Sequence, residues 1–131
     1  MLIKGKDEIV NFCSKANISN NPRVPFDNLV IEYLKVLYEE LKKNINRDSL
    51  ADIHALLFWL RPQNINKIKR DYENSKLRQG LGIIFHITPS NMPINFFYSY
   101  LFGLLSGNIN IVRVPSKNFT QTDFLMNILD K

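Results

Sequence analysis

Residues 81–114 read LGIIFHITPSNMPINFFYSYLFGLLSGNINIVRV, and this stretch decides the fold. The run at 81–87 is continuously apolar, which is typical of a β-strand buried on both faces. A turn rich in Pro, Ser and Asn follows at 88–93. Residues 94–106 are apolar nearly all round, so we expect a deeply buried helix there, with Pro93 at its first position.

A second strand and another helix come after this buried helix. Gly107 supplies a helix stop, and residues 110–114 form a β-rich run. Thr120 and Asp123 approximate a capping box, which predicts a last helix reaching Lys131. The order β-α-β-α predicts a parallel pair of strands with a right-handed crossover, which is half of a nucleotide-binding type of sheet. Because two strands do not make a stable open sheet, we expect an α/β fold that is incomplete in this chain.

The sequence before residue 79 has a different composition and a helical pattern. We expect a short helix at 7–16 and a long one at 27–44, with Asp27 as its N-cap. Two further helices are expected, one capped by Asp48 or Ser49 and interrupted at Arg61-Pro62, and one at 63–74. We therefore divide the chain into a helical segment, 1–78, and an α/β segment, 79–131.

Composition and charge exclude several classes of protein. The chain has 131 residues, enough for one core, and its single cysteine excludes a disulfide framework and a multi-cysteine zinc site. A reducing, cytoplasmic setting fits that cysteine usage. The net charge of +5 is spread along the chain, and its one basic cluster, Lys67–Arg70, is followed at once by acidic residues. We interpret this cluster as a solvated helix face and expect no nucleic-acid partner.

Membrane insertion is the more serious alternative, because residues 79–112 carry no Asp, Glu, Lys or Arg. Prolines, glycines and asparagines interrupt this stretch, and its densest apolar part, 94–105, has only 12 residues. A bilayer span needs about 20. We therefore expect a soluble buried core and no membrane span, and the N-terminus does not resemble a signal peptide.

Candidate chemistry is expected where the two strands end, since open α/β sheets bind ligands beyond the carboxyl ends of their strands. Asn91 lies between two prolines, and its amide could stabilise an oxyanion or simply cap the next helix. Arg113, Ser116 and Lys117 lie close together after the second strand. Cations and hydroxyls suit a phosphate or a ribose, although ordinary loop polarity explains them equally well.

Other chemistry-bearing residues give weaker signals. The chain has neither the glycine fingerprint of dinucleotide-binding sheets nor a P-loop. His54 and His86 have no partners at metal-ligand spacing, so we expect no metal, and we interpret His86 as a core histidine. Cys13 has no nearby histidine and is interpreted as a small buried hydrophobe.

Taken together, three motifs within residues 81–117 resemble one family. They are HITPSNMP at 86–93, GLLSGN at 103–108 and IVRVPSK at 111–117. The pattern resembles the long-chain acyl-CoA reductases, the fatty acid reductases of bacterial bioluminescence and their relatives, a branch of the aldehyde dehydrogenase superfamily. The resemblance implies that 79–131 begins a Rossmann-like NAD(P)-binding domain that lacks the glycine fingerprint, and that the chain is the N-terminal portion of such an enzyme.

The resemblance also implies roles for individual residues. Asn91 matches the asparagine that donates to the oxyanion of the thioester. The residues before it would line the nicotinamide ribose: Ile87, Thr88, Pro89 and Ser90. The loop that holds the adenosine ribose corresponds to residues 113–117, in which Arg113, Pro115, Ser116 and Lys117 are the candidate cofactor-binding residues. This loop has one extra residue, so either Arg113 or Val114 stands at the family's lysine position.

The implied activity is reduction of a fatty acyl thioester to an aldehyde. Two cations and no acid in the cofactor loop favour NADPH over NADH. The implied partners are a fatty acyl-CoA or acyl-carrier thioester and an acyl-transferring enzyme, and a homo-oligomer is expected for the full-length protein. The family's nucleophilic cysteine lies downstream of the matching residues and Cys13 does not match it, so we expect this chain alone to be inactive.

Two other classes of function remain open at this point. One is a non-catalytic interaction module that uses the β-α-β unit as a docking platform, for which self-association without NADPH binding would be the sign. The other is a membrane-associated protein that uses residues 81–106, for which partition into detergent would be the sign.

Overall fold

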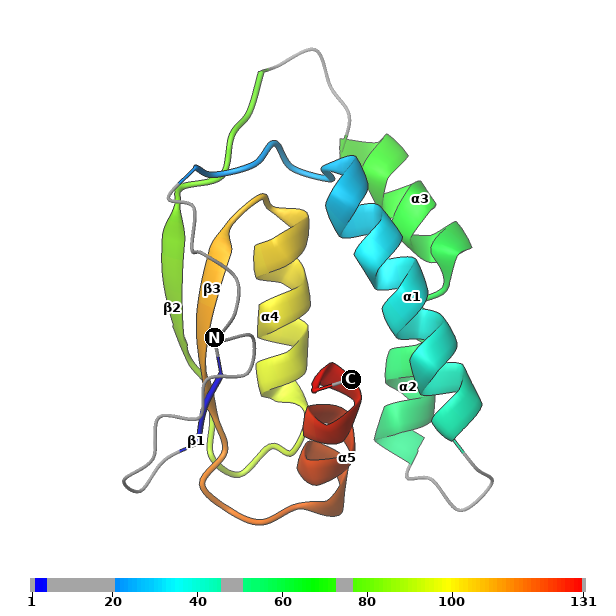
Figure 1. Cartoon of the computed structure of the whole chain (residues 1–131), viewed down its shortest axis with the longest axis vertical. Helices are drawn as coiled ribbons and strands as arrows, with labels where there is room; N and C mark the ends of the chain where they lie inside the picture. The colour runs from blue at the N-terminus through cyan, green and yellow to red at the C-terminus, as the bar shows by residue number, and fades with distance from the viewer. Residues whose placement is uncertain (1, 5–20, 46–50, 73–76, 131) are drawn as a thin grey trace.

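The computed structural model describes residues 2–4, 21–45, 51–72 and 77–130. Three strands and five helices are assigned in these ranges (Figure 1). In chain order they are β1 Leu2–Lys4, α1 Asn28–Asn44, α2 Ala51–Trp59, α3 Pro62–Tyr72, β2 Ile83–Ile87, α4 Asn95–Leu105, β3 Ile109–Val114 and α5 Thr120–Leu129.

The strands form one parallel sheet in the order β1-β3-β2. The pairing of β2 with β3 confirms the predicted parallel β-α-β unit, in which Ile87 lies opposite Arg113. The prediction of only two strands was wrong, because Leu2–Lys4 pair with β3 on its other edge. Three residues are too few to show the period of a strand, so the sequence pattern gave no signal for β1.

The described helices lie on one side of the sheet (Figure 1). Helix α4 packs directly on β3 and β2, and α1 contacts α4 and α5 as well as α2 and α3. A single hydrophobic core joins these layers, with its largest fully buried side chains in α1, α2, α4 and α5: Leu34, Leu41, Leu56, Phe96, Phe97 and Leu125.

The other face of the sheet is open among the described residues. Along β2, Ile83, Phe85 and Ile87 are 54%, 54% and 73% exposed, whereas Ile84 and His86 are half-buried beneath α4. The prediction of a strand buried on both faces was therefore wrong for this part of the chain. The physical reason is that α4 covers only the face to which the even-numbered residues of β2 point.

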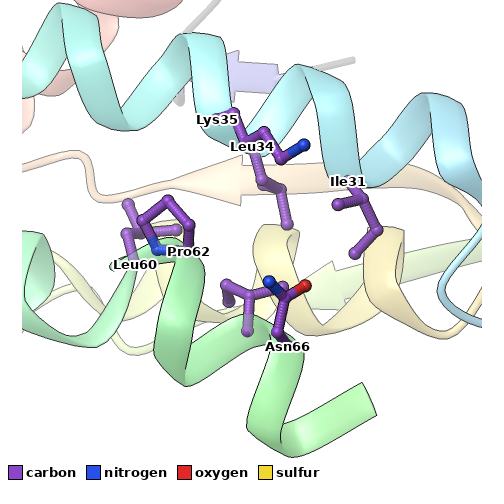
Figure 2. Close-up of a pocket in the computed structure, with 7 residues that line it drawn as sticks. Ile31, Leu34, Lys35, Leu60, Pro62 and Asn66 are labelled. Carbon is purple, nitrogen blue, oxygen red and sulfur yellow. The ribbon is translucent and has the colours of Figure 1, made fainter. Parts of the chain in front are cut away.

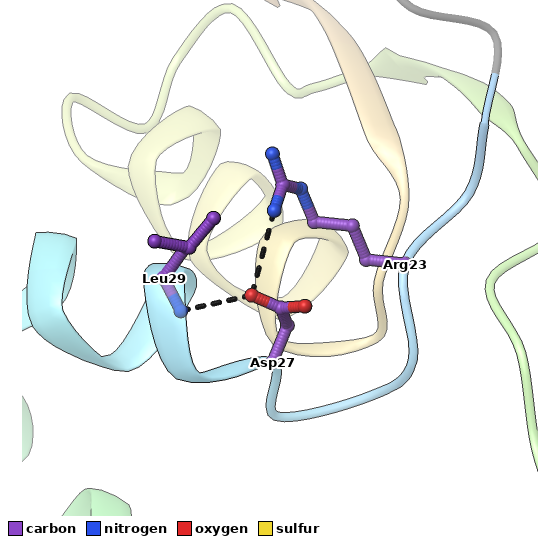
Figure 3. A network of polar contacts seen from close by, with 3 residues as sticks. All are labelled: Arg23, Asp27 and Leu29. Atoms are coloured by element: carbon purple, nitrogen blue, oxygen red, sulfur yellow. Dashed lines mark hydrogen bonds and ion pairs between the residues drawn. The ribbon is translucent and has the colours of Figure 1, made fainter.

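Helix α1 begins as its sequence predicts. The Asp27 carboxylate accepts a hydrogen bond from the Leu29 amide at 2.8 Å, and an Arg23 guanidinium nitrogen lies 3.4 Å from the same oxygen (Figure 3). The carboxylate therefore satisfies one of the unpaired N–H groups at the start of the helix. The next two helices are also confirmed with the break at Arg61, while the proposed cap residues, Asp48 and Ser49, lie outside the described residues.

Helix α4 begins later than expected. Its N-cap is Ile94, so the placement of Pro93 at the first helical position was wrong. The Pro93 carbonyl accepts a hydrogen bond from the Thr122 hydroxyl at 2.7 Å, and the Phe97 amide donates instead to Ile94 at 3.0 Å. Because Phe102 is 52% exposed, the helix is also not buried all round.

Helix α5 has no side-chain cap. Its N-cap is Phe119, and the Thr120 hydroxyl contacts the Gln121 amide oxygen at 3.3 Å. The predicted capping box of Thr120 and Asp123 was therefore wrong, because Thr120 is already inside the first turn. Lys131 and the proposed helix at 7–16 lie outside the described residues.

A polar contact crosses the β2–β3 pair beneath α4. The His86 Nε2 and the Asn110 Oδ1 lie 2.8 Å apart, and the Asn110 Nδ2 donates to the Asn108 carbonyl at 3.0 Å. Gly103 of α4 lies directly above, where a Cβ atom would overlap the Asn110 amide. A glycine is required here because the helix approaches the strand too closely for any side chain.

Candidate functional site

The turns that follow β2 and β3 lie at the same edge of the sheet. Strand register sets Ile87 opposite Arg113, so residues 88–93 and 115–119 leave the sheet side by side. The Thr88 hydroxyl donates to the Arg113 carbonyl at 2.7 Å and ties the two strand ends together. The structure thus brings together the two groups of candidate residues that the sequence places after separate strands, 87–91 and 113–117.

Asn91 is exposed at the tip of the first turn. Since the N-cap of α4 is Ile94 and this cap has no side-chain hydrogen bond, the alternative interpretation of Asn91 as a helix cap was wrong. Pro89 and Pro93 flank the turn and fix two of its φ angles. Within the described ranges no hydrogen bond is found for the exposed Asn91 amide, whose two N–H groups are donors of the kind that ligand oxygens accept.

The other candidate residues divide by burial. Thr88 and Pro115 are buried, so their side chains belong to the packing of the two strand ends. Pro89, Ser90, Ser116 and Lys117 are exposed and line the edge itself. An edge with hydroxyls, an amide and a cation has hydrogen-bond donors of the kind that phosphate and ribose oxygens accept.

Arg113 lies somewhat apart from this group. Burial along β3 alternates, with Asn110, Val112 and Val114 buried under the helices and Arg113 exposed. Its side chain is therefore on the open face of the sheet, on the same side as Ile87, rather than in the turn with Lys117. A ligand that reached both cations would bend around the end of β3.

Thr122 is the site-forming residue that the sequence analysis missed. It is fully buried, and its hydroxyl holds the Pro93 carbonyl at the far end of the Asn91 turn. A signal for it was present, because Thr122 shares a stripe with Leu125, Met126 and Leu129 at helical spacing. A threonine on an apolar stripe requires a buried hydrogen-bond partner.

The pocket in Figure 2 is a different feature. It lies between α1 and α3 and holds about 200 Å³ of empty space, open solvent included. The lining is mostly apolar, from Ile31, Leu34, Leu60, Pro62 and Ile65, with Lys35 and Asn66 at its rim. The space that a water-sized molecule can occupy within it is about 10 Å³, room for about one water, so this hollow is too small for a dinucleotide.

Two further observations bear on the chemistry. No group of three His, Cys, Asp or Glu side chains that could hold a metal ion occurs within the described ranges, and Cys13 lies outside them. None of the helices in those ranges is both long enough and apolar enough to cross a bilayer.

Comparison with known proteins gave one match. No curated protein and no solved structure is significantly similar to the chain. A protein-family model described as acyl-CoA reductase (LuxC) matches residues 12–131, which covers both candidate turns and every described helix.

Proposed function

The chain belongs to the acyl-CoA reductase (LuxC) family, and on that premise we propose that it forms the cofactor side of an enzyme that reduces a fatty acyl thioester to an aldehyde. The observation that carries the proposal is the junction of the two turns after β2 and β3, joined by the hydrogen bond between Thr88 and Arg113. This junction sets an exposed amide and an exposed cation at one edge of a parallel sheet, where ligands of such sheets bind.

Asn91 is the proposed oxyanion donor. The reaction class begins with attack of a cysteine thiolate on the thioester carbonyl carbon, which places a negative charge on the carbonyl oxygen. An amide N–H fixed in a stiff turn stabilises that charge without having to reorganise. We propose that the thiolate comes from a residue other than Cys13, whose sequence surroundings do not match those of the family's nucleophile.

NADPH is the proposed reductant and supplies the hydride when it is bound. Ser116 and Lys117 are exposed in the turn after β3, and this turn has no acidic residue among 113–119. Such a donor set fits a ribose that carries a 2′-phosphate. Arg113 would meet the same phosphate from the open face of the sheet, and Ile87, Pro89 and Ser90 would pack beside the nicotinamide ribose. The proposed setting is cytoplasmic, with acyl-CoA or an acyl-carrier thioester as the substrate.

Replacement of Asn91 tests the proposal. In the form of the enzyme that carries the nucleophilic cysteine, we expect Asn91→Ala to lower kcat by roughly 10²- to 10³-fold, the usual cost of losing one oxyanion donor. The measurement is NADPH oxidation with a fatty acyl-CoA. Asn127→Ala, on the exposed side of α5, is the matched control and should leave the rate unchanged. An Asn91→Ala enzyme with the rate of the unmodified protein would remove Asn91 from this role.

A further inference from the structure

Two buried threonine hydroxyls hold the turn that carries Asn91, one at each end. At the strand end, the Thr88 Oγ1 donates to the Arg113 carbonyl at 2.7 Å. At the helix end, the Thr122 Oγ1 donates to the Pro93 carbonyl, also at 2.7 Å. Thr88 is 7% exposed and Thr122 is 0% exposed, so water does not compete for either bond.

These hydroxyls act where the backbone has few donors of its own. Pro89 and Pro93 have no N–H group, so neither can anchor the turn by a backbone donor. In the described part of the chain, the bonds from Thr88 and Thr122 are the side-chain hydrogen bonds that reach this turn. Both bonds connect the turn to the β3–α5 part of the chain, since Arg113 lies on β3 and Thr122 on α5.

We infer that Thr88 and Thr122 are positioning residues that fix the Asn91 turn against the β3–α5 connection. This inference rests on the proposed function. In it, the two hydroxyls hold the proposed oxyanion donor, Asn91, in place relative to the turn after β3. It also changes the expected role of Thr88. Its one hydroxyl proton is donated to the Arg113 carbonyl, so the side chain sets the spacing of the two turns and does not donate to a ribose.

The expected effect is on the rate of the chemical step. A donor that is displaced by about 1 Å can cost roughly 10²-fold in rate, even when the substituted residue does not touch the substrate. Valine has nearly the shape of threonine but cannot donate a hydrogen bond. We therefore expect Thr122→Val to lower kcat by roughly 10- to 100-fold while the KM for NADPH changes little.

A double-mutant cycle with Asn91→Ala separates positioning from general stability. If Thr122 acts through Asn91, Thr122→Val lowers kcat in the unmodified enzyme but has no further effect in the Asn91→Ala background. Thr122→Ser keeps the hydroxyl and should restore most of the rate. Thr120→Val removes an exposed hydroxyl from the same helix and is the matched control.

Each outcome of the cycle has a definite meaning. Equal losses in both backgrounds, or a Thr122→Ser enzyme as slow as Thr122→Val, would overturn the positioning role. A normal rate for Thr122→Val beside a slow Asn91→Ala enzyme would overturn this inference and leave the proposed function standing. A normal rate for Asn91→Ala would instead defeat the oxyanion role itself.

A second measurement does not depend on activity. In the 131-residue chain, ¹⁵N relaxation should show backbone amides of Ser90, Asn91 and Met92 becoming more mobile in Thr88→Val and in Thr122→Val, but not in Thr120→Val. Unchanged relaxation of these three amides in both variants would overturn the inference. If one of the two variants fails to fold, the relaxation of the other variant still tests it.

Discussion

Single residues at the carboxyl edge of the sheet differ in what they offer a ligand. Asn91 offers an uncharged donor on the first turn, Lys117 brings positive charge to the second turn, and Arg113 brings positive charge to the open face beside it. In the proposed function, the two cations are the residues expected to distinguish the two nicotinamide cofactors, because NADPH carries a 2′-phosphate that NADH lacks.

The double variant Arg113→Ala/Lys117→Ala tests this charge-based selectivity. We expect the Kd for NADPH to rise more than the Kd for NADH, since only NADPH loses charge-assisted hydrogen bonds to its phosphate. Titration of cofactor fluorescence measures both constants. Lys67→Ala/Lys69→Ala on α3 removes the same net charge elsewhere and controls for long-range electrostatics. Equal losses for the two cofactors would contradict the 2′-phosphate assignment.

The sequence alone identified some of these residues and not others, for a physical reason. Asn91, Ser116 and Lys117 are polar residues directly after apolar strands, and that local pattern is visible in a single sequence. Thr122 is 29 residues from the carbonyl it holds, so its partner is known only once the helices are packed. The position of Arg113 on the open face likewise depends on which side of the sheet α4 covers.

At the scale of single elements, α1 shows how a local signal determines a boundary. Asp27 accepts from the Leu29 amide and also lies beside Arg23, so two different interactions converge on one carboxylate. The cap satisfies a backbone donor, whereas the ion pair is exposed and worth little. The start of α4 has no such local signal, because its N-cap, Ile94, makes no side-chain hydrogen bond. The preceding Pro93 carbonyl accepts a hydrogen bond from Thr122 of α5, which is distant in the sequence.

Two substitutions at Asp27 separate the cap from the ion pair. We expect Asp27→Ala to lower the free energy of unfolding by about 1 kcal/mol, the usual value of an N-cap. Asp27→Asn keeps a capping oxygen and loses only the charge, so its loss should be a few tenths of a kcal/mol at about 0.15 M salt. Urea denaturation measures both values. Equal losses for the two variants would mean that the charge, rather than the cap, stabilises α1.

At the scale of the whole molecule, the main feature is a parallel sheet whose described helices cover one face only (Figure 1). Parallel sheets usually have both faces covered. Here the open face presents Ile83, Phe85 and Ile87, with Arg113 beside them. The continuous apolar run at 81–87 is typical of a strand with both faces covered, and the described residues cover one of these two faces.

The open face should bind a hydrophobic dye. We expect the 131-residue chain to increase the fluorescence of anilinonaphthalene sulfonate, and Ile83→Thr/Phe85→Thr to reduce that increase severalfold, because threonine keeps β-propensity while removing apolar area. Val36→Thr, an exposed apolar residue on α1, is the control and should change the signal little. A signal unaffected by the double variant would place the dye elsewhere.

The contact beneath Gly103 determines which imidazole nitrogen of His86 donates a hydrogen bond. The Asn110 Nδ2 is committed to the Asn108 carbonyl, so the atom that faces the histidine is the amide oxygen, which can only accept. His86 must therefore donate through Nε2, and its neutral ring is the Nε2–H tautomer. The hydrogen bond from this Nε2–H to the Asn110 amide oxygen therefore joins β2 to β3 side chain to side chain, beneath the one residue of α4 that has no side chain of its own.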